Sequence, residues 1–137
     1  MGSALAEGLI GAQWCPPGDL AVVETALEQR DVLIQRLPGV AVLASLEIEH
    51  VDDASGVVIC VKPEHAEAVA RLAGAMGATR LLSVVAGLST ARIEATLSAP
   101  VAVIRSMPNT PVLVRKGVSA IEMCIRDRPN PFVRRPR

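Results

Sequence analysis

Residues 56–64 have the sequence GVVICVKPE, and this stretch decides the fold class. The apolar, mostly β-branched run at residues 56–61 predicts a strand that is covered on both faces, which is typical of a parallel sheet. Pro63 stands where proline is favoured, in the first turn of a helix. The stretch therefore predicts a strand that leads directly into a helix over about residues 64–77.

Similar segments flank this stretch on both sides. Short apolar strands alternate with helical patterns through short connections, which indicates an α/β fold built on a parallel sheet with helices on both faces. The other predicted strands cover residues 20–24, 40–43, 81–85 and 101–104, and the other predicted helices cover residues 1–13, 26–37 and 89–98. A strand and a turn are expected within residues 112–121.

Composition limits the class of protein. The chain has 137 residues, 50% hydrophobic and 20% charged, with a formal net charge of zero, which excludes a disordered chain. Neither nucleic acid nor a membrane is expected as a partner. There is no charge excess and no apolar run near the roughly 20 residues of a membrane span, and only Trp14 and Phe132 offer rings for base stacking. Three cysteines do not make a disulfide framework, so the reduced cytoplasm is the expected compartment.

The last sixteen residues differ from the rest, because residues 122–137 hold five arginines, three prolines and the only phenylalanine. Their first part, EMCIRDR, resembles the translation of a transposase end sequence that is used to prepare sequencing libraries. We therefore expect residues 1–121 to form the domain and residues 122–137 to be a non-native tail. A basic surface tail and a nucleic-acid-binding tail are the alternatives.

Two residues near the N-terminus match parts of a dinucleotide-binding unit. Gly2 opens the first predicted helix, as the last glycine of a phosphate-binding loop does, although a packing or cap glycine would look the same. Glu24 ends the next strand, at the distance where an acid accepts a hydrogen bond from the ribose 2′-hydroxyl of NAD. A solvated glutamate explains Glu24 equally well. Arg30 is near enough to offset its charge, so the cofactor preference stays open.

Two motifs lie at the carboxyl ends of the next predicted strands, where open parallel sheets bind ligands. Lys62 and Pro63 put a cation beside the start of a helix, although an exposed lysine before a helix-starting proline is the simpler explanation. Residues 84–87 are small enough at their end for a flat ring to lie against the backbone. A turn glycine is the simpler explanation for that motif.

Residues 107–111 form a third motif, in which two prolines stiffen a loop that presents Asn109 and Thr110. A proline-rich turn with a capping asparagine is the alternative. His50 and His65 have no neighbours at the spacing of metal ligands, so no metal site is predicted.

Taken in order, these motifs resemble the pyrroline-5-carboxylate reductase family. The matching stretches are Met1-Gly2-Ser3-Ala4-Leu5, Val61-Lys62-Pro63, Ser83-Val84-Val85-Ala86-Gly87 and Ile104-Arg105-Ser106-Met107-Pro108-Asn109-Thr110-Pro111. Four motifs in the same order and at similar spacing are specific. The resemblance covers about residues 1–121 and implies a Rossmann-type, doubly wound, mainly parallel sheet that binds NAD(P) and that here lacks its first strand.

The resemblance implies an oxidoreductase that reduces the C=N bond of 1-pyrroline-5-carboxylate to L-proline, in proline biosynthesis, with NADPH or sometimes NADH. The cofactor supplies the hydride chemistry and the protein orients it. The implied cofactor-binding residues, beside Glu24, are Met1, Gly2, Cys60, Val61, Lys62, Pro63, Val84, Val85, Ala86 and Gly87. The implied substrate-side loop comprises Met107, Pro108, Asn109 and Thr110.

The chain departs from the family pattern in what surrounds these motifs. We expect the glycine-rich loop and the helical C-terminal domain to be missing, and the asparagine that many members carry before the central strand is not evident near Leu46 or Glu47. No catalytic residue is therefore assigned, homo-oligomers are expected only of the full-length protein, and the fragment is expected to be inactive and poorly stable. The alternatives are another NAD(P)-dependent imine or 2-hydroxyacid reductase and a non-catalytic nucleotide-binding module.

Overall fold

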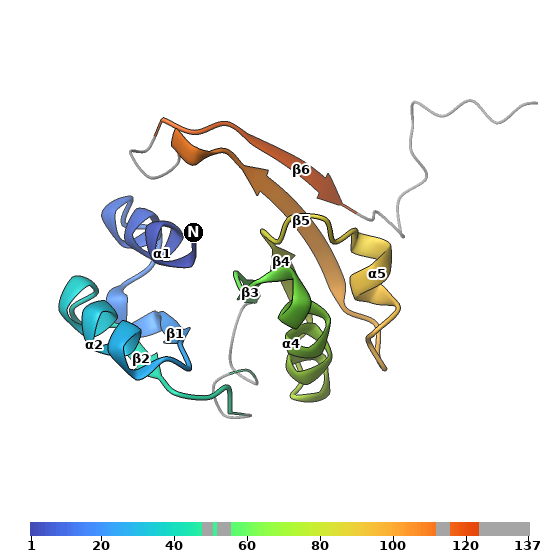
Figure 1. Cartoon of the computed structure of the whole chain (residues 1–137), viewed down its shortest axis with the longest axis horizontal. Coiled ribbons are helices and arrows are strands. Elements are labelled where there is room, and N and C mark those ends of the chain that lie inside the picture. The colour runs from blue at the N-terminus through green and yellow to red at the C-terminus, as the bar shows by residue number, and fades with distance from the viewer. Residues whose placement is uncertain (48–50, 52–55, 112–115, 124–137) are drawn as a thin grey trace, which may run out of the picture.

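The computed structural model describes residues 1–47, 51, 56–111 and 116–123, and its helices and strands alternate along most of the chain, as predicted (Figure 1). The elements are α1 (Gly2–Gly11), a 3-10 turn (Pro17–Asp19), β1 (Ala21–Val23), α2 (Leu27–Arg36), β2 (Ala41–Leu43), β3 (Val57–Ile59), α4 (Pro63–Ala75), β4 (Arg80–Ser83), α5 (Thr90–Glu94), β5 (Ala102–Pro108) and β6 (Ser119–Met123).

The strands form two separate sheets. β1 and β2 pair in parallel, with Val22 opposite Val42. The second sheet has the order β3-β4-β5-β6, in which the first three strands are parallel and β6 is antiparallel to β5. The predicted α/β class with a mainly parallel sheet is confirmed. In a doubly wound sheet one further strand pairs with the equivalents of both β1 and β3, and among the described residues each of these two strands has one unpaired edge.

The smaller sheet has its own core with α1 and α2. Ala6, Leu33 and Leu37 are buried there, and apolar side chains of β1 and β2 pack around them. An exposed ion pair between Arg36 Nη2 and Glu7 Oε1, 2.7 Å apart, joins the two helices. In Figure 1 these four elements, drawn in blue to teal, form one group, and β3 to β6 with α4 and α5 form another.

The larger sheet is covered on one face by α4 and α5, which contact each other as well as the strands. α4 packs through Ala66, Ala70 and Ala73, each fully buried, whereas Leu72 on the same helix is 44% exposed. Alanine has no bulk beyond Cβ, so the helix approaches the strands closely. An aromatic core is not needed at this spacing, in agreement with the composition.

The other face of the larger sheet is less covered than the sequence predicts. Val58 was expected in a strand buried on both faces, but its side chain is 42% exposed, while Ile59 beside it is 1% exposed. Val58 stands opposite Leu82, which is half-buried. Among the described residues, therefore, β3 buries only one of its two faces.

The C-terminal ends of α5 and β5 differ more from the predictions than those of the other elements. α5 ends at Glu94 and not at residue 98, because Thr96 directs both its hydroxyl and its N–H to the carbonyl of Ile93, at 2.7 and 3.0 Å. β5 continues to Pro108, where a loop was predicted, because β6 pairs with it and brings Ser119 opposite Pro108. β4 pairs only as far as Arg105, so the missing N–H of Pro108 breaks no bond on that side.

The predictions for the C-terminal tail and for His50 lie mostly outside the described residues. β6 includes Glu122 and Met123, the first residues of the expected tail, whereas residues 124–137 and His50 are outside the described part. None of the helices in the described part is long and apolar enough to cross a membrane. No three or more His, Cys, Asp or Glu side chains gather to hold a metal within the same residues.

Candidate functional site

The start of α1 lies against the residue that follows β3. A Cβ atom added at Gly2 would stand 3.1 Å from the Cβ of Cys60, which is tighter than ordinary van der Waals contact. Glycine at this position therefore permits the close approach of helix and strand end. Both residues belong to the predicted cofactor-binding set, and the structure brings them together. Their role in binding stays a prediction.

The first turn of α1 has the properties of an anion-binding helix terminus. Met1 occupies the N-cap position without a side-chain cap, and the turn contains no acidic residue. The carbonyl of Met1 accepts a hydrogen bond from Leu5 at 3.1 Å. The first backbone N–H groups of a helix have no partner within the helix, and the helix dipole makes them favourable for a phosphate.

Replacing Gly2 by alanine tests the close approach, with Gly8 as the matched control. Gly8→Ala meets nothing within 4 Å and should stabilise the chain by about 0.5–1 kcal/mol, because alanine is the better residue inside a helix. Gly2→Ala should lack this gain, because the Cβ of Cys60 is attached to the backbone and has no rotamer to move to. Thermal melting compares the two variants. Equal stabilisation by both substitutions would show that the contact imposes no constraint.

Burial controls the chemistry of Cys60. Loss of hydration raises the pKa of its thiol above the ordinary value, although the positive amino terminus of the chain acts in the opposite direction. A thiol with a raised pKa stays protonated near neutral pH, so Cys60 is not an activated nucleophile. The inert thiol leaves Cys60 a packing role beside Gly2.

The ends of β3 and β4 present two of the predicted motifs, Lys62-Pro63 and residues 84–87, side by side. The N–H of Val84 donates to the carbonyl of Ile59 at 3.1 Å, which ties the residue after β4 to the end of β3. Lys62 is the N-cap of α4 and Pro63 its first residue, so the predicted helix start is confirmed. Lys62 is exposed.

The turn after β4 has a bare backbone surface. Gly87 is exposed, its φ is +72°, and a Cβ added there would meet nothing within 4 Å. Val85 in the same turn is buried, and its N–H donates to Oγ of Ser83 at 3.3 Å. This fits a flat ligand lying on the peptide plane. Sequence reasoning missed the supporting role of Ser83, because nothing distinguishes it from other serines until its complete burial is seen.

Glu24 directly follows β1, which ends one residue earlier than predicted. Its N–H donates to the carbonyl of Leu43 at 2.9 Å, and its Oε1 accepts from the N–H of Ala26, also at 2.9 Å. The residue is half-buried. Its hydrogen bonds with the described residues stay within β1, β2 and the start of α2, so they do not join it to Gly2 or Cys60.

The loop predicted to face a substrate has a structural role in this chain. Asn109 Oδ1 accepts from the N–H of Val118 at 3.0 Å, and the N–H of Asn109 donates to the carbonyl of Val118 at 3.2 Å. These two bonds close the connection between β5 and β6, which corresponds to the capping alternative. Thr110 is exposed, whereas Met107 and Pro108 are half-buried in β5. Any contact of these residues with a substrate stays a prediction.

A polar cluster that the sequence did not indicate holds β6 in place. Glu122 accepts hydrogen bonds from Thr90 Oγ1 at 3.1 Å and from Arg105 Nη1 at 3.2 Å. Arg105 stands opposite Glu122 in the register of β5 and β6. Nε of Arg105 is buried and has no hydrogen-bond partner among the described residues. The cluster depends on pairing across about 30 residues of sequence, so no local pattern could reveal it.

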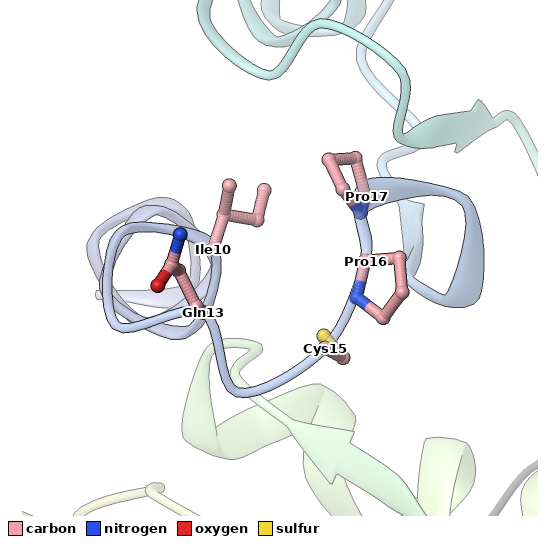
Figure 2. A pocket seen from close by; sticks show the side chains of 5 residues that line it. All are labelled: Ile10, Gln13, Cys15, Pro16 and Pro17. Carbon is pink, nitrogen blue, oxygen red and sulfur yellow. The ribbon is translucent and has the colours of Figure 1, made fainter.

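A pocket of about 380 Å³ lies at the opposite end of α1 from Gly2, and Figure 2 shows the side chains that line it. Ile10 and Gln13 form one wall, and Cys15, Pro16 and Pro17 form the other. None of the predicted site residues lines it, so this pocket is not the predicted nucleotide site.

Comparison with known proteins relates the whole arrangement to one family, although no family model matches the chain. The chain is 37% identical over 124 residues to pyrroline-5-carboxylate reductase of Pseudomonas aeruginosa, covering 85% of this chain and 44% of the relative. It is 35% identical over 126 residues to the enzyme of the same name from Corynebacterium melassecola, covering 88% and 46%. The chain thus spans less than half the length of the curated relatives that it matches.

Solved structures have the same fold. A pyrroline-5-carboxylate reductase from Coxiella burnetii superposes with a TM-score of 0.74 at 25% identity, over 86% of this chain and 44% of the other. The Plasmodium falciparum pyrroline carboxylate reductase, solved with NADP bound, superposes with a TM-score of 0.75 at 24% identity, over 92% and 45%. These two neighbours support the Rossmann-type fold. The curated relatives and the Coxiella burnetii structure assign the chain, as a segment spanning less than half of those proteins, to the pyrroline-5-carboxylate reductase family.

Proposed function

We propose that the chain is the nucleotide-binding part of a pyrroline-5-carboxylate reductase that takes NADPH or NADH and a cyclic imine, 1-pyrroline-5-carboxylate. The main support is the contact between the start of α1, which has no side-chain cap, and Cys60 at the end of β3. This contact occurs in a chain that is 37% identical to such a reductase. The bound NADP of the Plasmodium falciparum neighbour supports the same class of cofactor. A domain over residues 1–121, a non-native tail over residues 122–137, cytoplasmic location and assembly of the whole protein into homo-oligomers belong to the same proposal.

Different residues of the chain would bind different parts of the cofactor. The N–H groups at Gly2 and in the rest of the first turn bind the pyrophosphate, and Glu24 binds the ribose of the adenosine half. Residues 60–63 and 84–87 flank the nicotinamide, where the bare backbone at Gly87 accepts the flat ring. When bound, the nicotinamide supplies the hydride that reduces the imine carbon, and the imine nitrogen takes up a proton.

The substrate would approach from the side of residues 107–110, after β5. Asn109 is held in place there by its two hydrogen bonds with Val118. No proton donor is assigned to the described residues. The part played by this chain is to bind and orient the cofactor and to exclude water from one side of the imine.

A chimera tests this function. Residues 1–121 replace the matching segment of the Pseudomonas aeruginosa relative, which keeps its own residues on both sides. We expect the chimera to form L-proline from 1-pyrroline-5-carboxylate with a reduced nicotinamide cofactor, and the 137-residue chain alone to form none.

The unmodified relative is the positive control for the assay. A chimera that melts cooperatively but forms no proline would contradict the proposed function. A chimera that prefers an unrelated imine or a 2-oxo acid would favour the alternative reductase. Proline formation by the chain alone would overturn the expectation that it supplies only part of the active site.

A further inference from the structure

We propose that the nucleotide site of this chain selects NADH, with its free ribose 2′-hydroxyl, over NADPH, and that Glu24 decides the selection. This inference rests on the proposed function. The geometry at the end of β1 carries it, because the sequence alone left Glu24 and Arg30 as competing influences on a 2′-phosphate.

Glu24 is held in a fixed position at the carboxyl end of β1. Its backbone N–H is bonded to Leu43 on β2, and its Oε1 accepts from the N–H of Ala26, both at 2.9 Å. Its other carboxylate oxygen, Oε2, accepts no hydrogen bond from the described residues. One oxygen therefore orients the carboxylate and the other remains available to a ligand at the edge of the sheet.

Arg30 forms no ion pair with this carboxylate. Its Nη1 donates to the carbonyl oxygens of Glu24 and Thr25, at 3.0 and 2.8 Å, so the guanidinium is engaged with the backbone of the turn. Neither Glu24 nor Arg30 takes part in an ion pair with another described residue. Turning Nη1 of Arg30 toward a phosphate would remove its hydrogen bonds to both carbonyls, which opposes the use of that nitrogen as a 2′-phosphate ligand.

These contacts favour the ribose of NADH, which has a free 2′-hydroxyl, over the ribose of NADPH, which carries a 2′-phosphate. A 2′-hydroxyl can donate a charge-assisted hydrogen bond to Oε2 of Glu24. A phosphate monoester carries a charge of about −1.5 to −2 at neutral pH and repels a carboxylate at the same position. The first turn of α1 meets only the pyrophosphate, which the two cofactors share. The discrimination therefore falls to the end of β1.

The first experiment measures binding of NADH and NADPH to the 137-residue chain by calorimetry and by cofactor fluorescence. We expect NADH to bind at least about tenfold more tightly, which corresponds to about 1.4 kcal/mol. Glu24→Gln, which keeps an oxygen acceptor but removes the charge, should reduce this ratio about tenfold, mainly by improving NADPH binding. Glu28→Gln is the matched control, because Glu28 is an exposed acid nearby in the sequence, in the first turn of α2, and the ratio of this variant should not change.

A second measurement keeps the inference testable if the chain alone binds neither cofactor. Residues 20–37 of this chain replace the matching segment of the Pseudomonas aeruginosa relative, with and without Glu24→Gln. Dissociation constants are measured beside KM and kcat for each cofactor. We expect the preference for NADH to move with the segment and to appear in binding and in KM, with kcat little changed.

The outcomes distinguish a failure of the NADH selectivity from a failure of the proposed reductase function. Equal or tighter binding of NADPH, in the chain or in the segment chimera, overturns the selection of NADH and leaves the reductase function standing. An unchanged ratio after Glu24→Gln removes Glu24 as the deciding residue. If the chain and the chimera of residues 1–121 bind neither cofactor although that chimera melts cooperatively, the proposed function itself fails.

Discussion

A chain extended before Met1 by one apolar strand and a glycine-rich turn is expected to be about 3 kcal/mol more stable than the 137-residue chain. β1 and β3 each have one unpaired edge among the described residues, and a strand between them would pair with both. Each new hydrogen bond contributes about 1 kcal/mol net, and part of the sum offsets the entropy of ordering the strand.

The structure also indicates where such a strand would enter. Gly2 lies against Cys60, so a segment that precedes α1 would end at the carboxyl end of β3, and a strand within that segment can run parallel to β3. Val23 and Val58, on the two strands with unpaired edges, are 39% and 42% exposed and would lose solvent contact. The added strand would therefore join two small cores into one.

Urea unfolding and amide hydrogen exchange measure the effect. We expect a single cooperative transition and new protection of amides in β1 and β3. The control is the same extension with proline at its central position, which removes a donor and should abolish most of the gain. If the extended chain were no more stable than the proline control, the pairing with β1 and β3 would be refuted.

Replacing Leu81 by alanine is expected to destabilise the extended chain by about 2–5 kcal/mol. Leu81 lies in β4, between β3 and β5, and is only 1% exposed. Truncation there removes buried apolar surface and leaves a cavity, because the two flanking strands cannot close over it. A loss of this size is a large fraction of the 5–15 kcal/mol that holds a typical domain folded.

Leu72→Ala provides the matched control, because it removes the same atoms from a side chain that is 44% exposed on α4. We expect this variant to lose less than about 1 kcal/mol. Denaturant midpoints and slopes compare both variants with the parent. A loss at Leu72 as large as that at Leu81 would mean that α4 packs in a different orientation from the one described.

The strand and helix order could be predicted because it depends on local patterns. The apolar run before Lys62 and the proline after it determine the β3–α4 unit without help from distant residues, and both appear in the structure. The ends of elements were less predictable. β5 runs to Pro108 only because β6 returns to pair with it, and α5 stops early because the side chain of Thr96 bonds to Ile93.

The sequence by itself determined the α/β class, the order of the elements and the family, because these depend on residue periodicity and on motifs whose order survives in one dimension. Only the tertiary structure decided which motifs meet. It brought Gly2 against Cys60, turned Asn109 toward Val118, and engaged Arg30 with carbonyl groups and not with Glu24. These contacts depend on how separate strands and helices pack in space, and a one-dimensional pattern carries no information about the direction of a side chain or about the partner it reaches.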